Sequence, residues 1–200
     1  RGYRIDLHPI LLVTDKRGKV LEEYHAPDSP IFGKKVLPPG VAFIISDILQ
    51  DNGARTMAFG PNSLLRIPNQ IVSVKTGTTN DYRDNWTIGY TPSLLVVTWV
   101  GNNDHTPMRG IVSGVTGAAP IWNILMSEFL KGKKPERISQ SSDVISRAVC
   151  TSNGANPPQE GCQTKREFFL KGVPVKQPIT RTEKVFVDKG TGDLAAPGQT

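Results

Sequence analysis

Three segments rich in apolar and β-branched residues follow one another closely, and they constrain the fold more than any other feature of this 200-residue sequence. They span residues 71–75, 86–90 and 94–100. Runs of this length and composition predict strands. The connections between them are too short for the crossovers that parallel strands need, and the Thr-Pro-Ser at 91–93 is typical of a hairpin turn. The sequence therefore predicts consecutive antiparallel strands of one sheet.

Two segments with apolar residues at helical spacing lie on either side of these strands in the sequence. Residues 40–51 predict one helix, which the Asn-Gly pair at 52–53 is expected to end. Residues 118–130 predict the other, and a stripe of apolar residues runs along one of its faces. That stripe consists of Ile121, Leu125 and Phe129. A helix on each face would bury both layers, so the predicted fold class is α/β of the α+β type, a mostly antiparallel sheet flanked by helices.

The first 24 residues predict a separate, smaller element. Extended segments on both sides of a polar turn at residues 15–18 predict a surface hairpin over residues 3–24. Residues 54–70 show no clear period and are expected to be irregular.

The composition changes at residue 135. Residues 1–134 contain the predicted sheet and helices, whereas residues 135–200 contain a run of Ser and Gln at 139–142, followed by the loop between the two cysteines. Only two weak strands are expected in this second part, near Phe168 and Val185. We therefore predict a main domain over residues 1–134 and an appended extension over residues 135–200 with a poor core.

The net charge of the chain limits the classes of binding partner that are expected. Lysine and arginine exceed aspartate and glutamate by 24 − 18 = 6, and the calculated isoelectric point is about 9.4. A basic balance is typical of proteins that meet nucleic acid, anionic membranes or anionic cell-wall polymers. The positive residues are scattered and no nucleic-acid-binding motif occurs, so no nucleic-acid partner is expected. No segment has the length of a membrane-spanning helix and no signal peptide opens the chain.

The two cysteines, Cys150 and Cys162, bracket a loop rich in Asn, Gly and Pro. No histidine lies near them in the sequence, which argues against a zinc site. Two interpretations remain open, free thiols or a disulfide. A disulfide would close a short loop, stabilise the folded state by about 3 kcal/mol in the chain-entropy model, and indicate an oxidising, extracytoplasmic compartment.

The candidate functional residues are the run Lys75-Thr76-Gly77-Thr78 at the end of the first predicted strand. A strand end of this kind presents a cation and hydroxyl groups in a row, and a glycine permits another group to approach the backbone. Together these groups could bind an anion and polarise a carbonyl. The Lys-Thr-Gly triplet at 75–77 is by itself weak evidence for such a site, because many strands simply end in polar residues at a turn.

The surrounding sequence makes the run more specific. Residues 74–92 (VKTGTTNDYRDNWTIGYTP), 99–104 (WVGNND), 113–122 (SGVTGAAPIW) and 44–55 (IISDILQDNGAR) resemble class A penicillin-binding proteins. The resemblance covers residues 1 to about 134. The tail, with its two cysteines and the segment EFFLKG, resembles the family's C-terminal extension less specifically.

The resemblance implies a partial domain of the serine transpeptidase and β-lactamase type. It implies a reaction in which a serine attacks the D-Ala-D-Ala amide of a peptidoglycan stem peptide, and an amine of a second peptide resolves the acyl-enzyme. β-Lactams would acylate the same serine. By motif match, Lys75 supplies positive charge and organises proton transfer, the hydroxyls of Thr76 and Thr78 bind the terminal carboxylate, Gly77 gives access, and the Thr78 N–H is one oxyanion donor. No cofactor and no metal site are expected.

Two motifs of the family are missing. The sequence contains no Ser-x-x-Lys nucleophile motif and no correctly placed Ser-Asp-Asn-type motif. In the family both lie upstream of the region matched here. The resemblance therefore implies a fragment that is inactive alone, partners with the N-terminal part of the same protein, and lies in the cell envelope with any membrane anchor upstream of residue 1.

Two other functions remain open on the sequence. The chain could be a non-catalytic module that binds peptidoglycan or a partner protein through the same groove. It could also be a piece of a serine β-lactamase, although the cysteine-containing tail and the run at 78–84 (TTNDYRD) speak against this.

Several conspicuous residues near the motif have structural interpretations. The polar run containing Asp81, Arg83 and Asp84 is expected to form a loop network, and the Asn-Asn-Asp at 102–104 a turn. No catalytic role is expected for His105. The three tryptophans are expected in the core or packed on the sheet. They are Trp86, Trp99 and Trp122.

Overall fold

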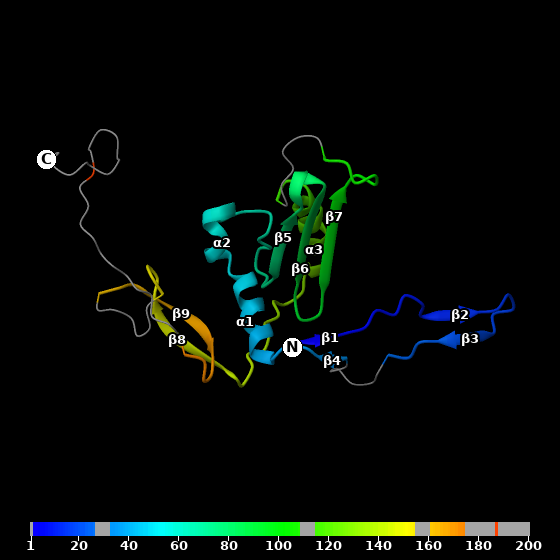
Figure 1. Cartoon of the computed structure of the whole chain (residues 1–200), viewed down its shortest axis with the longest axis horizontal. Coiled ribbons are helices and arrows are strands. Elements are labelled where there is room, and N and C mark those ends of the chain that lie inside the picture. The colour runs from blue at the N-terminus through cyan, green and yellow to red at the C-terminus, as the bar shows by residue number, and fades with distance from the viewer. Residues whose placement is uncertain (1, 27–32, 109–114, 155–160, 175–186, 188–200) are drawn as a thin grey trace. The chain divides into compact units, whose positions relative to one another are not determined.

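The computed structural model describes residues 2–26, 33–108, 115–154, 161–174 and 187. Contacts within the chain divide it into two compact units, Arg1–Val144 and Ile145–Thr200 (Figure 1). The domain boundary predicted after residue 134 stays a prediction. Among the described residues, no helix combines the length and the apolar character that crossing a bilayer requires.

The centre of the first unit is a three-stranded antiparallel sheet in the order β5-β6-β7 (Figure 1). The strands are β5 (Ser73–Thr78), β6 (Asp84–Tyr90) and β7 (Leu95–Gly101). Adjacent strands pair along their whole lengths. The predicted fold class and the predicted antiparallel strand order are therefore confirmed. Within the described residues, β5 and β7 form the two edges of this sheet.

One face of the sheet, called the inner face here, is covered by the helix α3 (Ala118–Leu130), which lies behind the strands in Figure 1. The predicted helix at 118–130 is thus confirmed. Its fully or nearly buried residues are Ala118, Ala119, Trp122, Met126 and Leu130. Together with apolar residues of the strands and of the segment before β5, these side chains form the main core.

The stripe of α3 chosen from the sequence is not the buried one. Ile121, Leu125 and Phe129 are 46%, 39% and 50% exposed. The helix carries two apolar stripes with the same helical spacing, and the packing partner decides between them. The stripe headed by Trp122 is buried because the inner face offers a depression that accepts an indole ring.

Gly89 of β6 makes that depression. A Cβ atom built on Gly89 would lie 2.2 Å from Trp122 Cζ2 and 2.7 Å from Trp122 Cε2. The indole ring therefore occupies the space that any other residue at position 89 would need. This close approach brings α3 onto the sheet at one defined place.

The opposite face, called the outer face here, is partly covered by α1 (Pro39–Gln50). Ser46 of this helix joins it to the sheet, since the Ser73 hydroxyl donates to the Ser46 carbonyl oxygen at 2.7 Å and Ser46 Oγ lies 2.8 Å from the Tyr90 hydroxyl. The predicted helix at 40–51 is confirmed.

The segment after α1 differs from the prediction. Residues 52–59 form a second helix, α2 (Asn52–Phe59), where the Asn-Gly pair was expected to end helical structure and irregular chain was expected to follow. Asp51 explains the difference, because its side chain accepts a hydrogen bond from the Ala54 N–H at 3.0 Å and so caps a new helix. The chain changes direction at Asp51 and then resumes helical structure.

The N-terminal residues form the predicted hairpin. β2 (Leu12–Thr14) and β3 (Val20–Glu23) pair in antiparallel fashion, and Asp15 Oδ1 accepts hydrogen bonds from the backbone N–H groups of Arg17 and Lys19 in the turn. A further short pair joins β1 (Tyr3–Arg4) to β4 (Lys34–Lys35).

The second unit is built around the pair of β8 (Val144–Cys150) and β9 (Thr164–Leu170), of which only Val144 belongs to the first unit. The expected strand near Phe168 is present, β8 was not expected, and Val185 lies outside the described residues. Cys150 and Cys162 form a disulfide with their Cα atoms 5.7 Å apart. Cys150 is the last residue of β8 and is fully buried. The disulfide therefore ties the end of β8 to Cys162, just before β9 begins at Thr164.

We expect Gly89→Ala to lower the free energy of unfolding by about 1–3 kcal/mol, because the new methyl group overlaps the Trp122 ring. Urea unfolding followed by tryptophan fluorescence measures the change. Gly77→Ala, on the neighbouring strand, is the matched control, since its Cβ would meet only Trp86 Cβ at an ordinary 3.6 Å. Equal effects of the two substitutions would show that Gly89 does not seat the indole.

We expect the double substitution of Cys150 and Cys162 by serine to lower amide hydrogen-exchange protection in β8 and β9, with a loss of about 3 kcal/mol of local stability in the chain-entropy model. Protection in β5, β6 and β7 should stay unchanged, because these strands belong to the other unit. Protection that persists in β8 and β9 would mean that strand pairing alone holds the second unit together.

Candidate active site

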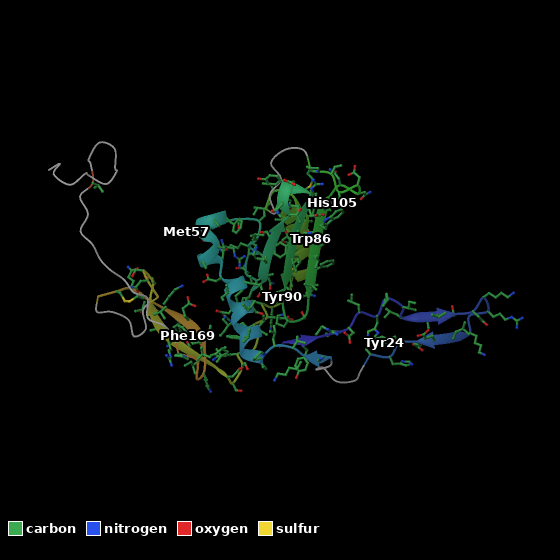
Figure 2. The ribbon with its side chains drawn as sticks, in the orientation of Figure 1. Tyr24, Met57, Trp86, Tyr90, His105 and Phe169 are labelled. Carbon is green, nitrogen blue, oxygen red and sulfur yellow. A yellow bond between two sulfur atoms is a disulfide. The ribbon has the colours of Figure 1, made fainter. Side chains whose placement is uncertain are left out.

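The run Lys75-Thr76-Gly77-Thr78 occupies the last four positions of β5, at an edge of the sheet. β5 has one neighbouring strand, β6, among the described residues. Its other side presents main-chain donors and acceptors that a further extended segment could pair with. Trp86 and Tyr90 of β6 are labelled in Figure 2, and they lie opposite Gly77 of this run and Ser73 at the start of β5.

The four residues alternate between the two faces. Lys75 and Gly77 lie opposite Ile88 and Trp86 on the outer face. Thr76 and Thr78 belong to the row that carries the inner-face residues of β6. The Lys75 side chain is exposed, and its Nζ donates to the Thr76 carbonyl oxygen at 2.5 Å. The strand thus places a cation on the outer face beside the free edge.

The main-chain direction of Thr78 follows from its neighbour. The Thr79 N–H donates to the Asp84 carbonyl oxygen at 3.0 Å, so position 79 faces β6. Main-chain groups alternate along an antiparallel strand, so the N–H groups of Thr76 and Thr78 are directed toward the free edge. These two N–H groups are thus directed away from β6, on the side of β5 where no further strand pairs among the described residues.

Gly77 is not required by packing within the described residues. A Cβ at this position would contact only Trp86 Cβ, at 3.6 Å. This contrasts with Gly89, where the Trp122 ring excludes any side chain. Gly77 therefore leaves little side-chain bulk on the outer face beside Lys75.

Asn85 is a site residue that the sequence did not single out. It is fully buried, its Nδ2 donates to Thr78 Oγ1 at 3.4 Å, and its Oδ1 accepts from the Ala118 N–H at 2.8 Å. The Ala118 N–H is one of the donors that a helix N-terminus leaves without an intrahelical partner. Asn85 thus connects the end of the candidate run to the first residue of α3.

The turn between β5 and β6 is closed by Thr79 and Asp84. The Asp84 N–H donates to Thr79 Oγ1 at 2.8 Å, and Trp99 Nε1 donates to Asp84 Oδ1 at 3.0 Å. Asp81 and Tyr82 have φ angles of 58° and 53°, a left-handed conformation that costs energy in residues other than glycine. The contacts of Asp84 hold this turn beside the candidate run.

The neighbouring loop is attached to the same turn. The Arg83 guanidinium donates to the His105 carbonyl oxygen at 2.7 Å, and His105 Nδ1 lies 3.6 Å from Asp84 Oδ2. In that loop the Thr106 hydroxyl and N–H donate to Asp104, and these hydrogen bonds lower the pKa of the Asp104 carboxyl. The polar residues 81–84 and 102–104 thus make the loop and turn contacts expected of them.

The outer face beside Lys75 is apolar and exposed. Trp86 and Trp99 lie opposite each other on β6 and β7 with ring centroids 6.3 Å apart. They are 39% and 41% exposed, so of the three tryptophans only Trp122 lies in the core. Three aliphatic residues of the same face are also exposed by more than 40%. They are Ile88, Leu95 and Val97.

We expect Asn85→Ala to lower the free energy of unfolding by about 1–3 kcal/mol, because the buried Ala118 N–H loses its partner. Asn123→Ala is the matched control, since it removes an exposed hydrogen bond from Asn123 Nδ2 to the Leu64 carbonyl oxygen, where water can replace it. Chemical denaturation compares the two. A loss at position 123 as large as that at 85 would count against the buried connection.

Comparisons with known proteins place the chain in a family. No family model matches the sequence, but individual proteins do. Penicillin-binding protein 1A of Clostridium botulinum (strain Hall) is 31% identical over 191 residues, which cover 92% of the chain and 22% of the relative. Penicillin-binding protein 1A of Neisseria meningitidis serogroup A is 29% identical over 177 residues, covering 88% of the chain and 20% of the relative.

A solved structure agrees with these relatives. The crystal structure of penicillin-binding protein 1A from Haemophilus influenzae matches with a TM-score of 0.64 over 90% of the chain and 31% of that structure, at 20% identity. At this identity the match establishes the transpeptidase-type fold. The chain spans about a fifth of the length of the curated relatives that it matches. It therefore belongs to the class A penicillin-binding proteins and corresponds to one segment of them.

Proposed function

We propose that this chain forms one side of the active site of a peptidoglycan D,D-transpeptidase, which cross-links stem peptides and binds penicillin in cell-wall synthesis. The observation that carries the proposal is the position of Lys75–Thr78 on an edge strand, with a cation and outward N–H groups at the free edge. The name and similarity of the penicillin-binding protein 1A relatives support it.

The edge of β5 suits an extended peptide. A stem peptide that ends in D-Ala-D-Ala can add along the free edge as a further strand, with hydrogen bonds to the main chain of β5. The exposed Lys75 ammonium, on the outer face of this edge, supplies positive charge and organises proton transfer. The hydroxyls of Thr76 and Thr78, in the inner-face row of the same edge, hold the terminal carboxylate. The Thr78 N–H, directed toward the edge, donates to the oxygen of the scissile carbonyl as negative charge develops there.

The nucleophile comes from another part of the protein. Residues 1–200 contain no Ser-x-x-Lys motif. In the proposed reaction, a serine hydroxyl from the N-terminal part attacks the D-Ala-D-Ala carbonyl carbon, the amide C–N bond breaks and the terminal D-Ala leaves. The amine of a second stem peptide then takes the acyl group and releases the serine. A β-lactam acylates the same serine but is not released in this way.

The exposed outer face supports the need for this second part. Trp86, Trp99 and the three exposed aliphatic residues form an apolar surface directly beside Lys75. Apolar surfaces of this kind on soluble proteins mark sites that another element covers. We propose that the N-terminal part of the same protein packs here, which brings its serine next to the Lys75–Thr78 run.

The proposed location is the cell envelope. The Cys150–Cys162 disulfide supports it, because such bonds persist in oxidising compartments outside the cytoplasm. The attachment to the membrane is proposed to lie upstream of residue 1, in the part of the protein that also carries the serine.

We expect residues 1–200 alone to form no covalent adduct with a fluorescent penicillin, because the nucleophile lies elsewhere. Gel fluorescence and intact-mass spectrometry measure this. A stoichiometric adduct would contradict the proposal, and its position would identify a nucleophile within the chain.

We also expect residues 1–200 to bind a stem pentapeptide ending in D-Ala-D-Ala more tightly than the tripeptide that lacks both D-Ala residues. NMR titration of the isotope-labelled chain should show shifts along β5. Lys75→Met should weaken pentapeptide binding about tenfold by removing the charge-assisted contact, and Lys171→Met, an exposed lysine of the second unit, should leave it unchanged. Equal binding of both peptides would overturn the assignment of β5 as the substrate edge.

A further inference from the structure

A hollow lies in the first unit, at the Tyr90 end of β6. It has a volume of about 570 Å³ and lies between α1, the β6–β7 turn and the segment 137–141. Tyr90, labelled in Figure 2 between α1 and the sheet, forms part of its wall. The register pairs Tyr90 with Ser73, the first residue of β5, so the hollow lies at the end of the strand that is two positions before Lys75 and five before Thr78.

Part of the lining of the hollow is apolar. Ala42 and Phe43 of α1, Pro92 of the turn and Ile138 line it, and Phe43 is only 7% exposed. The volume falls in the range of about 300–1,000 Å³ that is typical of small-molecule sites, which are mostly apolar with a few convergent polar groups. The hollow therefore has the size and the lining to hold the aromatic or aliphatic body of a small ligand.

The polar groups of the hollow are fixed by hydrogen bonds to the fold. Ser46 is 8% exposed, and its Oγ donates to the Ala42 carbonyl oxygen at 2.9 Å. A serine hydroxyl has one proton, so in the 2.8 Å contact of Ser46 Oγ with the Tyr90 hydroxyl the tyrosine is the donor. The Tyr90 oxygen keeps the capacity to accept a hydrogen bond, and a ligand N–H or O–H can supply it.

The charge of the lining is one-sided. Arg137 is its one ionised side chain, and no Asp or Glu lines the hollow. The neighbouring Glu136 is directed to the β6–β7 turn, where its Oε1 accepts from Ser93 Oγ at 2.9 Å. Among the described residues, no carboxylate lies within ion-pair distance of Arg137. An exposed arginine in the lining of a partly apolar hollow favours a carboxylate or similar anion.

We propose that this hollow is a binding site for a small organic anion that has an apolar ring or chain, a carboxylate and one N–H or O–H donor. The apolar body lies against Phe43 and Ile138, the carboxylate pairs with Arg137, and the donor group bonds to the Tyr90 oxygen. This site is separate from the Lys75–Thr78 run, and the proposal does not depend on the transpeptidase function.

Indole-3-acetate is a suitable probe, because it carries an indole ring, an N–H group and a carboxylate. Its neutral counterpart indole-3-acetamide has the same ring and size. NMR titration of isotope-labelled residues 1–200 with the acid should give saturable shifts at Phe43, Ser46, Tyr90 and Ile138. The amide should bind at least about tenfold more weakly, since it cannot form the charge-assisted contact with Arg137.

Two substitutions test the assignment. Arg137→Gln, at an exposed position where folding is not at risk, should weaken binding of the acid about tenfold, while Arg17→Gln, in the surface turn of the hairpin, should not. Ala42→Leu should abolish the saturable shifts by filling the hollow, while Ala58→Leu, on the exposed surface of α2, should preserve them.

Three results would each overturn the proposal. The first is equal binding of the acid and the amide. The second is acid binding that Arg137→Gln leaves unchanged. The third is a set of shifts centred on the exposed outer face at Trp86, Val97 and Trp99, which would mean that the probe simply adheres to apolar surface.

Discussion

The packing of α3 on the sheet, and with it the order of the candidate run, depends on the contact between the Trp122 ring and Gly89. This contact seats α3 on the inner face of the sheet and thereby decides which stripe of that helix is buried. The row that receives the helix on β6 consists of Asn85, Thr87 and Gly89, all small or polar, because a bulky apolar row would hold the helix away. With the helix this close, Asn85 can reach the Ala118 N–H and Thr78 Oγ1 together, so the packing of the core also orders the end of the candidate run.

The two faces of the sheet serve different purposes. The inner face is filled by α3, whereas α1 covers only the end of the outer face near Ser73 and Tyr90. The remainder of the outer face exposes two tryptophans beside an exposed lysine. Exposing apolar side chains of this kind to water is unfavourable, which supports the proposal that a second element covers that face.

The sequence predicted those elements whose pattern is local. The three strands and the helix at 118–130 were predictable because length, β-branching and helical period all agreed there. α2 was missed because an Asn-Gly pair is typical of a helix end, and only the Asp51 cap reveals that a new helix starts. The buried stripe of α3 depends on a glycine 33 positions earlier in the sequence (122 − 89), so helical spacing alone could not select it. Lys75–Thr78 was found through its motif. The role of Asn85 depends on contacts with residues distant in the sequence, and the alternating small or polar residues at 85, 87 and 89 are the one pattern that hints at it.

β5 is held at both ends by polar contacts, the first buried and the second part-buried, with the exposed Lys75 between them. At its start, the buried Ser73 hydroxyl donates to the Ser46 carbonyl oxygen of α1, and at its end Thr78 Oγ1 accepts from the buried Asn85. Between these points Lys75 and Gly77 face outward with little packed on them. An edge strand anchored in this way loses little conformational freedom when a peptide pairs with it, because the strand is already ordered. The same Ser46 also forms part of the hollow lined by Arg137, so one buried residue of α1 contributes to the fixed geometry of both proposed sites.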